Sequence, residues 1–355
     1  MRNCWCGASK LSYFSEEYSN CSECGTLVSQ KSLTDEQLHV GNDNTDFYGK
    51  KYWLDHQKQD LGFPDIYERA RNDLTDRNLH WINTLLKYCR PPGRVLELGC
   101  SHGSFVALLR QAGYDAAGVE MSPWVVEFGR KAFDIAISIG PVESLEIPTG
   151  SIDAIALMDV LEHLPAPVST MAYCLQLLKP NGIMLLQTPQ FKQKMDYKAL
   201  VDDNGAFLEQ LKSDEHLYLF SKQSASLLFQ QLGAEYIQFE PAIFSRYDMF
   251  FAISREPFQI YDSEQIESTL LATPNGRIVL ALLDMYSRKK TLQKLTEDIS
   301  ANRDIVLSQV HTLTEQVHTL TEQVHTLTEL MEQKLVKFSL ILSNSFKHFA
   351  KKIFR

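Results

Sequence analysis

The chain has no long apolar segment and no excess of positive charge. No apolar run approaches the roughly 18 residues needed to span a bilayer, so we expect no transmembrane helix. The net charge of −9 argues against nucleic acid as a partner of the whole chain. Cys4 and Trp5 open a polar stretch and not the apolar core of a signal peptide. We therefore expect a cytoplasmic protein with reduced thiols.

Cysteine is sparse and concentrated near the N-terminus. Four of the seven cysteines form two close pairs separated by fourteen residues: Cys4, Cys6, Cys21 and Cys24. Two thiolate pairs at this spacing can converge on one tetrahedral zinc ion. We predict a structural zinc knuckle over residues 1–30, in which four thiolates leave the metal no open position for catalysis. Two disulfides, or thiols without a function, are the alternatives.

Short apolar strands alternate with helical segments from Val95 onward. Helices between strands imply a parallel, doubly wound α/β sheet that is covered on both faces. A helix over 69–88 is predicted to lead into this fold, and another over 221–232 to follow its later strands. The strands expected first are 95–98, 114–119, 135–139, 152–157 and 183–187.

The turn after the first of these strands has the features of a ligand site. Gly99 and Gly103 allow the backbone to pass close to a ligand, and the following helix offers free N–H groups. Glu97 lies at the strand end, where it suits a cationic or amino-bearing ligand better than a pyrophosphate. Glu120 ends the next strand about 20 residues later, where a carboxylate can bind both hydroxyls of a ribose.

This region resembles the class I S-adenosylmethionine (SAM)-dependent methyltransferases. Residues 97–103, Glu-Leu-Gly-Cys-Ser-His-Gly, are similar to the family's first motif, with Ser101 at the middle glycine position. Residues 151–164 resemble its fourth-strand motif, and 177–186 resemble its helix, turn and fifth strand. The resemblance covers roughly 91–254.

The resemblance implies a mostly parallel, seven-stranded Rossmann-like sheet, with 236–239 and 249–253 as its last strands. It also implies SAM as the cofactor. Glu97 would receive the ammonium of SAM, Glu120 would hold its ribose, and Met121 would pack on its adenine. Pro141 stands where relatives carry an acid, so adenine recognition falls to the Val142 backbone or to Glu143. The cofactor-binding residues expected are Glu97, Gly99, Ser101, Gly103, Glu120, Met121, Val142 and Glu143.

Candidate catalytic residues follow the fourth strand, at the edge where open α/β sheets bind ligands. His163 is the first candidate for a general base, because its ordinary pKa lies near neutrality. The alternative is that His163 only packs around the following turn. Asp159 lies on the same segment, and His216, in a polar loop before the 221–232 helix, is a further candidate.

The segment before this domain, residues 31–90, is a polar connector with aromatic residues clustered over 47–53. Many methyltransferases that resemble this chain place such a segment over the SAM pocket as a helical cover. The alternative is a linker whose aromatic residues dock on the domain surface. Both interpretations stay open at this point.

A seven-residue repeat dominates the C-terminal part. After a helical linker over 255–300, residues 309–315 recur as 316–322 and 323–329 within a predicted coiled coil over 301–333. Valine takes the a position and leucine the d position, which favours a parallel two-stranded coiled coil. We expect a homodimer, with a trimer as the alternative. The histidines at b face a glutamate four residues on, as surface pairs.

Residues 334–355 carry six Lys or Arg and no Asp or Glu. Their apolar residues follow an eleven-residue period on one face of a helix. Such a basic amphipathic tail suits an anionic membrane surface, and a continued oligomer core is the competing interpretation.

We therefore expect a SAM-dependent methyltransferase, dimeric and peripheral on the inner membrane face. Its likeness to bacterial sugar-modifying methyltransferases implies a sugar or cell-surface glycan as acceptor. One alternative is an O-methyltransferase of a small lipophilic, quinone-like acceptor. The other is a non-catalytic scaffold that retains the fold.

Overall fold

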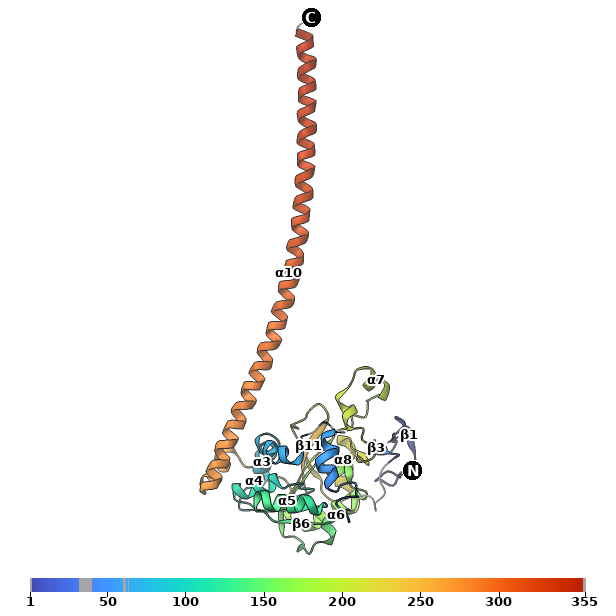
Figure 1. Cartoon of the computed structure of the whole chain (residues 1–355), viewed down its shortest axis with the longest axis vertical. Coiled ribbons are helices and arrows are strands. Elements are labelled where there is room, and N and C mark those ends of the chain that lie inside the picture. The colour runs from blue at the N-terminus through green and yellow to red at the C-terminus, as the bar shows by residue number, and fades with distance from the viewer. Residues whose placement is uncertain (1, 32–39, 60–61, 63, 354–355) are drawn as a thin grey trace. The chain divides into compact units, whose positions relative to one another are not determined.

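The computed structural model describes residues 2–31, 40–59, 62 and 64–353 (Figure 1). The chain divides into two compact units, Met1–Tyr286 and Ser287–Arg355. Within the described residues, no helix is both long enough and apolar enough to cross a membrane.

A seven-stranded sheet runs through the first unit, in the order β10-β11-β8-β7-β4-β5-β6. The five strands from β8 to β6 are parallel, whereas β11 is antiparallel to both β8 and β10. This confirms the expected mostly parallel sheet of seven strands. The strands are β4 (Arg94–Leu98), β5 (Asp115–Glu120), β6 (Ile137–Ile139), β7 (Ile152–Met158), β8 (Leu178–Pro189), β10 (Tyr236–Glu240) and β11 (Asp248–Ser254).

Two apolar cores lie on the two faces of this sheet. Successive strand residues alternate between the cores, as Val95 and Leu96 do in β4 and as Phe250 and Phe251 do in β11. Both faces are therefore buried, as in a doubly wound fold. One core includes residues of α3 (Arg77–Tyr88) and α4 (Ser104–Ala112), and the other includes residues of α6 (Pro167–Leu177) and α8 (Lys222–Gln231).

The predicted helix over 69–88 is wrong in detail, because it is divided. Asp65 accepts hydrogen bonds from the backbone N–H groups of Tyr67 and Glu68, so a separate helix starts there. Asp76 then leaves the helical conformation, with φ −140° and ψ −76°. The segments are α2 (Ile66–Asn72), the 3₁₀ turn η2 (Asp73–Thr75) and α3. The turn expected before the fifth strand also differs, because its residues belong to β8. The register between β7 and β8 is irregular there, since Ile152 pairs with Leu178 and Ala154 pairs with Ile183.

A second sheet, which the sequence analysis did not anticipate, joins the cysteine segment to the main domain. Its order is β1-β2-β3-β9, and Leu27 and Val28 of β3 pair with Leu219 and Tyr218 of β9. These strands are β1 (Leu11–Tyr13), β2 (Tyr18–Cys21), β3 (Leu27–Ser29) and β9 (Tyr218–Leu219). The N-terminal segment is therefore not an isolated knuckle.

The remaining elements are short, apart from the last helix. They are η1 (Tyr52–His56), α1 (Gln57–Gln59), α5 (Pro123–Phe133), η3 (Val142–Ser144), η4 (Leu161–His163), α7 (Tyr197–Asp202), η5 (Ala206–Gln210), α9 (Ser263–Leu271) and α10 (Pro274–Ile353).

Helix α10 begins in the first unit, where Val279 is buried, and it forms the described part of the second. The a and d residues of the heptads are exposed, with Val317 at 62% and Leu320 at 59%. The expected surface pairs are confirmed, since His311 lies 3.5 Å from Glu315 and the next two repeats form the same pair.

Candidate active site

A cavity of about 360 Å³ lies at the carboxyl ends of β4 and β7. Residues from several parts of the chain line it: the ends of β4, β7 and β8, the segment from the connector to α3, the loop that leads into β9, and the start of β11 with the loop before it. They contribute, among others, Tyr52, Trp53, Glu97, Gly99, Ser101, Asp159, Glu162, His163, Glu215, His216 and Asp248. The position agrees with the general location of ligands in open α/β sheets.

The turn after β4 requires its glycines. Gly99 and Gly103 have φ of +63° and +75°, in the left-handed region that glycine adopts readily. A Cβ on Gly99 would meet the Val160 side chain, and one on Gly103 would meet that of Ile135. Ser101 adopts the same left-handed region, with φ +52°, at the position where the related motif has glycine.

Glu97 is a buried carboxyl group at the wall of this cavity. Its side chain is 4% exposed, and its Oε2 atom has no hydrogen-bond partner among the described residues. Burial, reinforced by the nearby Glu120, raises the pKa of Glu97 well above its ordinary value. A cationic ligand would supply the missing partner and favour the charged carboxylate, so Glu97 fits the ammonium group of SAM.

Glu120 ends β5 and is held by three backbone N–H groups. Ser101 donates to it over 3.0 Å, Met121 over 2.8 Å and Ser122 over 3.1 Å. Burial still raises the pKa of Glu120, against the opposing effect of these hydrogen bonds. The hydrogen bond from Ser101 joins the turn after β4 to the end of β5, the two places that are expected to bind the nucleoside part of the cofactor.

The other expected cofactor residues lie along the neighbouring strand ends and not on the cavity wall. Met121 follows β5, and Val142 is buried in η3. Glu143 is exposed and accepts a hydrogen bond from the Thr170 hydroxyl over 2.6 Å. The residues outside the cavity lining are Gly103, Glu120, Met121, Val142 and Glu143.

The connector lies against the candidate site. Tyr52 and Trp53 line the cavity, which favours the cover interpretation over a linker docked elsewhere. Asp43 accepts hydrogen bonds from the Ser122 hydroxyl over 3.0 Å and from the Trp124 N–H over 2.9 Å. Asp43 therefore binds the N-terminus of α5, beside the end of β5. The sequence analysis missed this residue because its partners lie about 80 positions away.

All three predicted catalytic residues, Asp159, His163 and His216, line the same cavity. Asp159 follows β7 in a left-handed conformation, with φ +59°, and accepts a hydrogen bond from Gln187 over 3.1 Å. His163 lies in η4, and its ring centroid is 4.9 Å from that of His216. The backbone N–H of Leu217 donates to the Glu162 carbonyl over 2.8 Å, so the loop carrying His216 is hydrogen-bonded to η4.

Burial keeps this part of the cavity low in charge. It raises the pKa of Glu162 to about 8 and that of Asp248 to about 9, in each case with a further contribution from Asp159. It lowers the pKa of His163 and lowers that of His216 well below its ordinary value. At neutral pH, the Glu162 and Asp248 carboxyl groups therefore favour the protonated form, and the His163 and His216 rings favour the neutral form. The sequence analysis missed Asp248, which the sheet topology brings here from β11.

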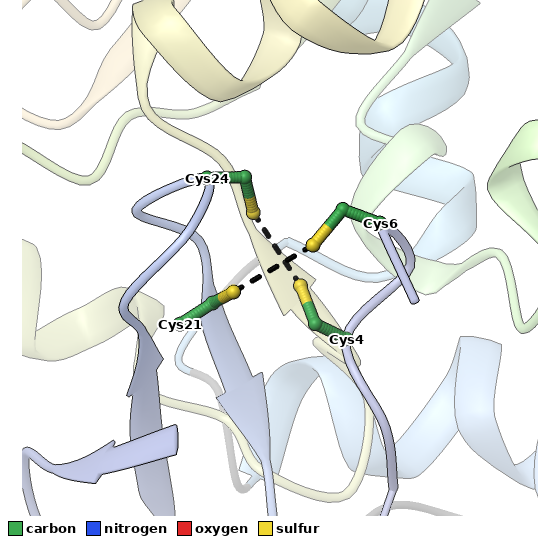
Figure 2. A group of neighbouring side chains, drawn as sticks. All are labelled: Cys4, Cys6, Cys21 and Cys24. Carbon is green, nitrogen blue, oxygen red and sulfur yellow. Dashed lines mark hydrogen bonds between the residues drawn. The ribbon is translucent and has the colours of Figure 1, made fainter. Parts of the chain in front are cut away.

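Four cysteines converge in the N-terminal segment, as the spacing predicted (Figure 2). The Sγ atoms of Cys4 and Cys24 are 3.4 Å apart, and those of Cys6 and Cys21 are 3.6 Å apart. Two thiolates on a tetrahedral zinc ion lie about 3.8 Å apart, so the four side chains fit such an ion. Hydrogen bonds from Cys4 and Thr26 lower the pKa of Cys24 to about 5, which favours a thiolate at this position.

Part of this chain is similar in sequence to known methyltransferases. Residues 67–238 match the model of a family described as a methyltransferase domain. A ubiquinone biosynthesis O-methyltransferase of Xanthomonas campestris pv. campestris (strain B100) is 32% identical over 105 residues, which cover 28% of this chain and 44% of the relative. Its counterpart in Xanthomonas axonopodis pv. citri (strain 306) is 30% identical over 128 residues, covering 33% and 54%. The chain thus spans about half the length of the curated relatives it matches.

Two solved structures are similar to part of this chain. A SAM-dependent methyltransferase of Thermotoga maritima is 18% identical, with a TM-score of 0.40, and the match covers 54% of this chain and 96% of that one. The YcgJ protein of Bacillus subtilis is 16% identical, with a TM-score of 0.41, and the match covers 51% and 99%. Residues 67–238 are therefore similar in sequence to a methyltransferase domain, and several residues of this range line the cavity.

We predict that Asp248→Asn stabilises the chain more as the pH rises. The pKa of an aspartate is near 3.9 in unfolded chains and about 9 for Asp248 in the fold, so the folded wild type retains a proton that the unfolded chain releases. The free energy of unfolding that this proton contributes to the wild type therefore decreases as the pH rises from the lower of these pKa values to the higher. Urea unfolding measures the free energy of unfolding of both proteins. Between pH 5 and pH 9, this free energy should rise for the variant relative to the wild type by more than about 1.4 kcal/mol, the equivalent of one pKa unit.

The control for this prediction is Asp115→Asn, which replaces an exposed acid at the start of β5. The difference in free energy of unfolding between this variant and the wild type should be independent of pH. A gain for Asp248→Asn that is equal at pH 5 and pH 9 would contradict the assignment of a neutral carboxyl group.

Proposed function

We propose that this protein transfers a methyl group from SAM to an acceptor bound beside His163 in the cavity. The observation that carries the proposal is that one cavity is lined by two kinds of group. The glycine turn and the unpartnered Glu97 carboxyl suit the cofactor, and His163 and His216 suit the acceptor. SAM would supply an electrophilic methyl group on its sulfonium sulfur.

The residues of the first two strand ends would hold the cofactor. Glu97 binds its ammonium group, with the backbone of Gly99, Ser101 and Gly103 alongside. Glu120 holds the ribose hydroxyls and Met121 packs on the adenine. The Val142 backbone or Glu143 receives the adenine amino group. Since methyl transfer is a direct displacement, the main task of these contacts is to align the reacting atoms.

The residues around His163 serve the acceptor. An acceptor hydroxyl must lose a proton, and His163 is our first choice of base. The Nδ1 atom of His163 lies 2.9 Å from the Glu215 carbonyl oxygen, to which it donates its hydrogen. Its Nε2 atom therefore carries the lone pair, and burial keeps the ring neutral. Asp159 and His216 lie beside it as the other candidates.

The curated relatives support an oxygen acceptor of the quinone-precursor type. Their name describes O-methylation in ubiquinone biosynthesis, and their matches are 30–32% identical over a third or less of this chain. This is the alternative acceptor from the sequence analysis. The sugar or glycan acceptor stays a prediction. A non-catalytic scaffold is the competing class, and it requires no SAM binding.

Calorimetry with S-adenosylhomocysteine tests the proposal. The wild type should bind it saturably, and Glu120→Ala should weaken binding about 10- to 100-fold, because charge-assisted hydrogen bonds to the ribose contribute about 1.5–3 kcal/mol. Asp115→Ala, at the exposed start of the same strand, is the matched control and should bind like the wild type. The absence of saturable binding in the wild type would favour the scaffold.

The four N-terminal cysteines would hold a structural zinc ion. The side chains meet at distances that fit tetrahedral coordination, and thiols in a reducing compartment remain available to a metal. The ion would tie the turn of Cys4 and Cys6 to the β2–β3 hairpin.

We predict that the double variant Cys21→Ser/Cys24→Ser loses one equivalent of zinc per chain, as measured by elemental analysis. Its thermal unfolding should shift to lower temperature, because the metal stabilises only the folded segment. Cys174→Ser, which alters a buried thiol in α6, is the control and should keep the wild-type zinc content. Equal zinc content in the double variant and the wild type would rule out this site.

The heptads would form a homodimeric coiled coil. Their exposed valine and leucine seam is the observation in support, because such a stripe is stable in water only against a partner.

The basic tail over 334–355 is still predicted to bind an anionic membrane surface. Apolar residues such as Phe338 and Phe346 are exposed there, as an interfacial helix requires.

We predict that Leu320→Asp, which introduces a charge at a d position, converts the oligomer to monomers in sedimentation equilibrium. His318→Asp, two positions earlier on the solvated face, is the control and should leave the mass unchanged. The wild-type mass distinguishes a dimer from a trimer. A wild type that sediments as a monomer would contradict self-association.

A further inference from the structure

Three side chains of the cavity form a donor set that methyl transfer alone does not explain. Glu162, His163 and His216 each direct one ligand atom into a space where these atoms lie within 4.8 Å of one another. The first two come from η4, and the third comes from the loop before β9. All three line the cavity. We propose that they form a second metal site, which binds a divalent cation of the zinc type.

Hydrogen bonds fix the tautomer of both histidines. The Nδ1 atom of His163 is 2.9 Å from the Glu215 carbonyl oxygen, and that of His216 is 2.7 Å from the Gln210 carbonyl oxygen. A carbonyl oxygen only accepts hydrogen bonds, so each Nδ1 carries the hydrogen. Each Nε2 is then left with its lone pair. Histidines that bind metals are held in this way, with the second ring nitrogen bonded to a backbone carbonyl or a carboxylate.

Glu162 supplies the second, independent observation. Its side chain is 1% exposed, and its Oε1 atom has no hydrogen-bond partner among the described residues. This atom lies 3.9 Å from the Nε2 atom of His163. The other oxygen accepts a hydrogen bond from the Thr188 hydroxyl over 2.9 Å, which orients the carboxyl group. An unpartnered buried oxygen is costly, and a bound cation removes that cost.

The donors select the class of cation. Two imidazoles and one carboxylate suit zinc and its transition-metal neighbours, whereas magnesium and calcium prefer oxygen ligands throughout. Two ligands on a tetrahedral zinc ion lie about 3.3 Å apart, so the side chains would close by roughly 1 Å around the ion. Three protein ligands leave one position open toward the cavity, as in catalytic zinc sites.

The role of this cation rests on the proposed function. In the open position it would bind an acceptor oxygen and lower the pKa of that hydroxyl, as metal ions do for bound water. The cation and a proton compete for the same lone pair on His163. With the cation bound, the coordinated acceptor hydroxyl has a lowered pKa and releases its proton to solvent water, and His163 acts as a ligand and not as a base.

Metal content tests the site. The full-length protein is loaded with Zn²⁺, desalted, and analysed for bound zinc. We expect Glu162→Gln and His216→Asn each to hold one equivalent per chain less than the wild type. The control is His56→Gln, which alters a histidine that contacts Glu215 but is not one of the three ligands; it should keep the wild-type content. Equal zinc content in the wild type and both ligand variants would overturn the proposal.

Cobalt separates this site from the cysteines. In the Cys21→Ser/Cys24→Ser background, added Co²⁺ should produce visible absorption bands, and these should vanish with His216→Asn. Far-UV circular dichroism confirms that each variant is folded, and Glu162→Gln repeats the test should His216→Asn unfold. No cobalt bands in the folded cysteine variant would also overturn the site. A wild type that holds this cation but does not bind S-adenosylhomocysteine would contradict the proposed function and leave the metal site standing.

Discussion

The pairing of β3 with β9 is the contact on which the candidate site depends. It joins residues about 190 positions apart, Leu27 with Leu219 and Val28 with Tyr218. Around it, the Ser29 hydroxyl donates to the Ser213 carbonyl over 2.6 Å, and the Tyr18 hydroxyl donates to the His216 carbonyl over 3.0 Å. The loop that carries His216 is thereby held against the cavity. The cysteine segment thus supports the wall of the site.

Burial of carboxyl groups determines the character of the cavity. Glu97, Glu162 and Asp248 are each buried near another acid, and the pKa of each is raised. Such groups are neutral until a positive charge approaches, and then favour the carboxylate. This is consistent with a cationic cofactor beside Glu97 and with a metal ion beside Glu162. The same property would leave the site less stable without its ligands at high pH.

The parts of the chain outside the shared domain contribute to the candidate site. The family match covers residues 67–238, whereas Tyr52 and Trp53 of the connector also line the cavity. The Tyr52 hydroxyl donates to Glu215 over 3.0 Å, and the Tyr48 hydroxyl lies 3.2 Å from Nδ1 of His163. These connector residues therefore lie outside the range that the family model matches, although they contact the candidate site.

Local spacing in the sequence was enough to identify the glycine turn after β4, the cysteine pairs, the heptads and the alternation of strands and helices that is typical of a doubly wound fold. Each depends on residues close together in the chain, where backbone geometry and side-chain period follow from near neighbours. The β3–β9 pairing, the Asp43 contacts and the presence of Asp248 beside Glu162 were decided only by the tertiary structure. These contacts join residues about 80 to 190 positions apart, and no local periodicity encodes which distant segments a folded sheet brings together.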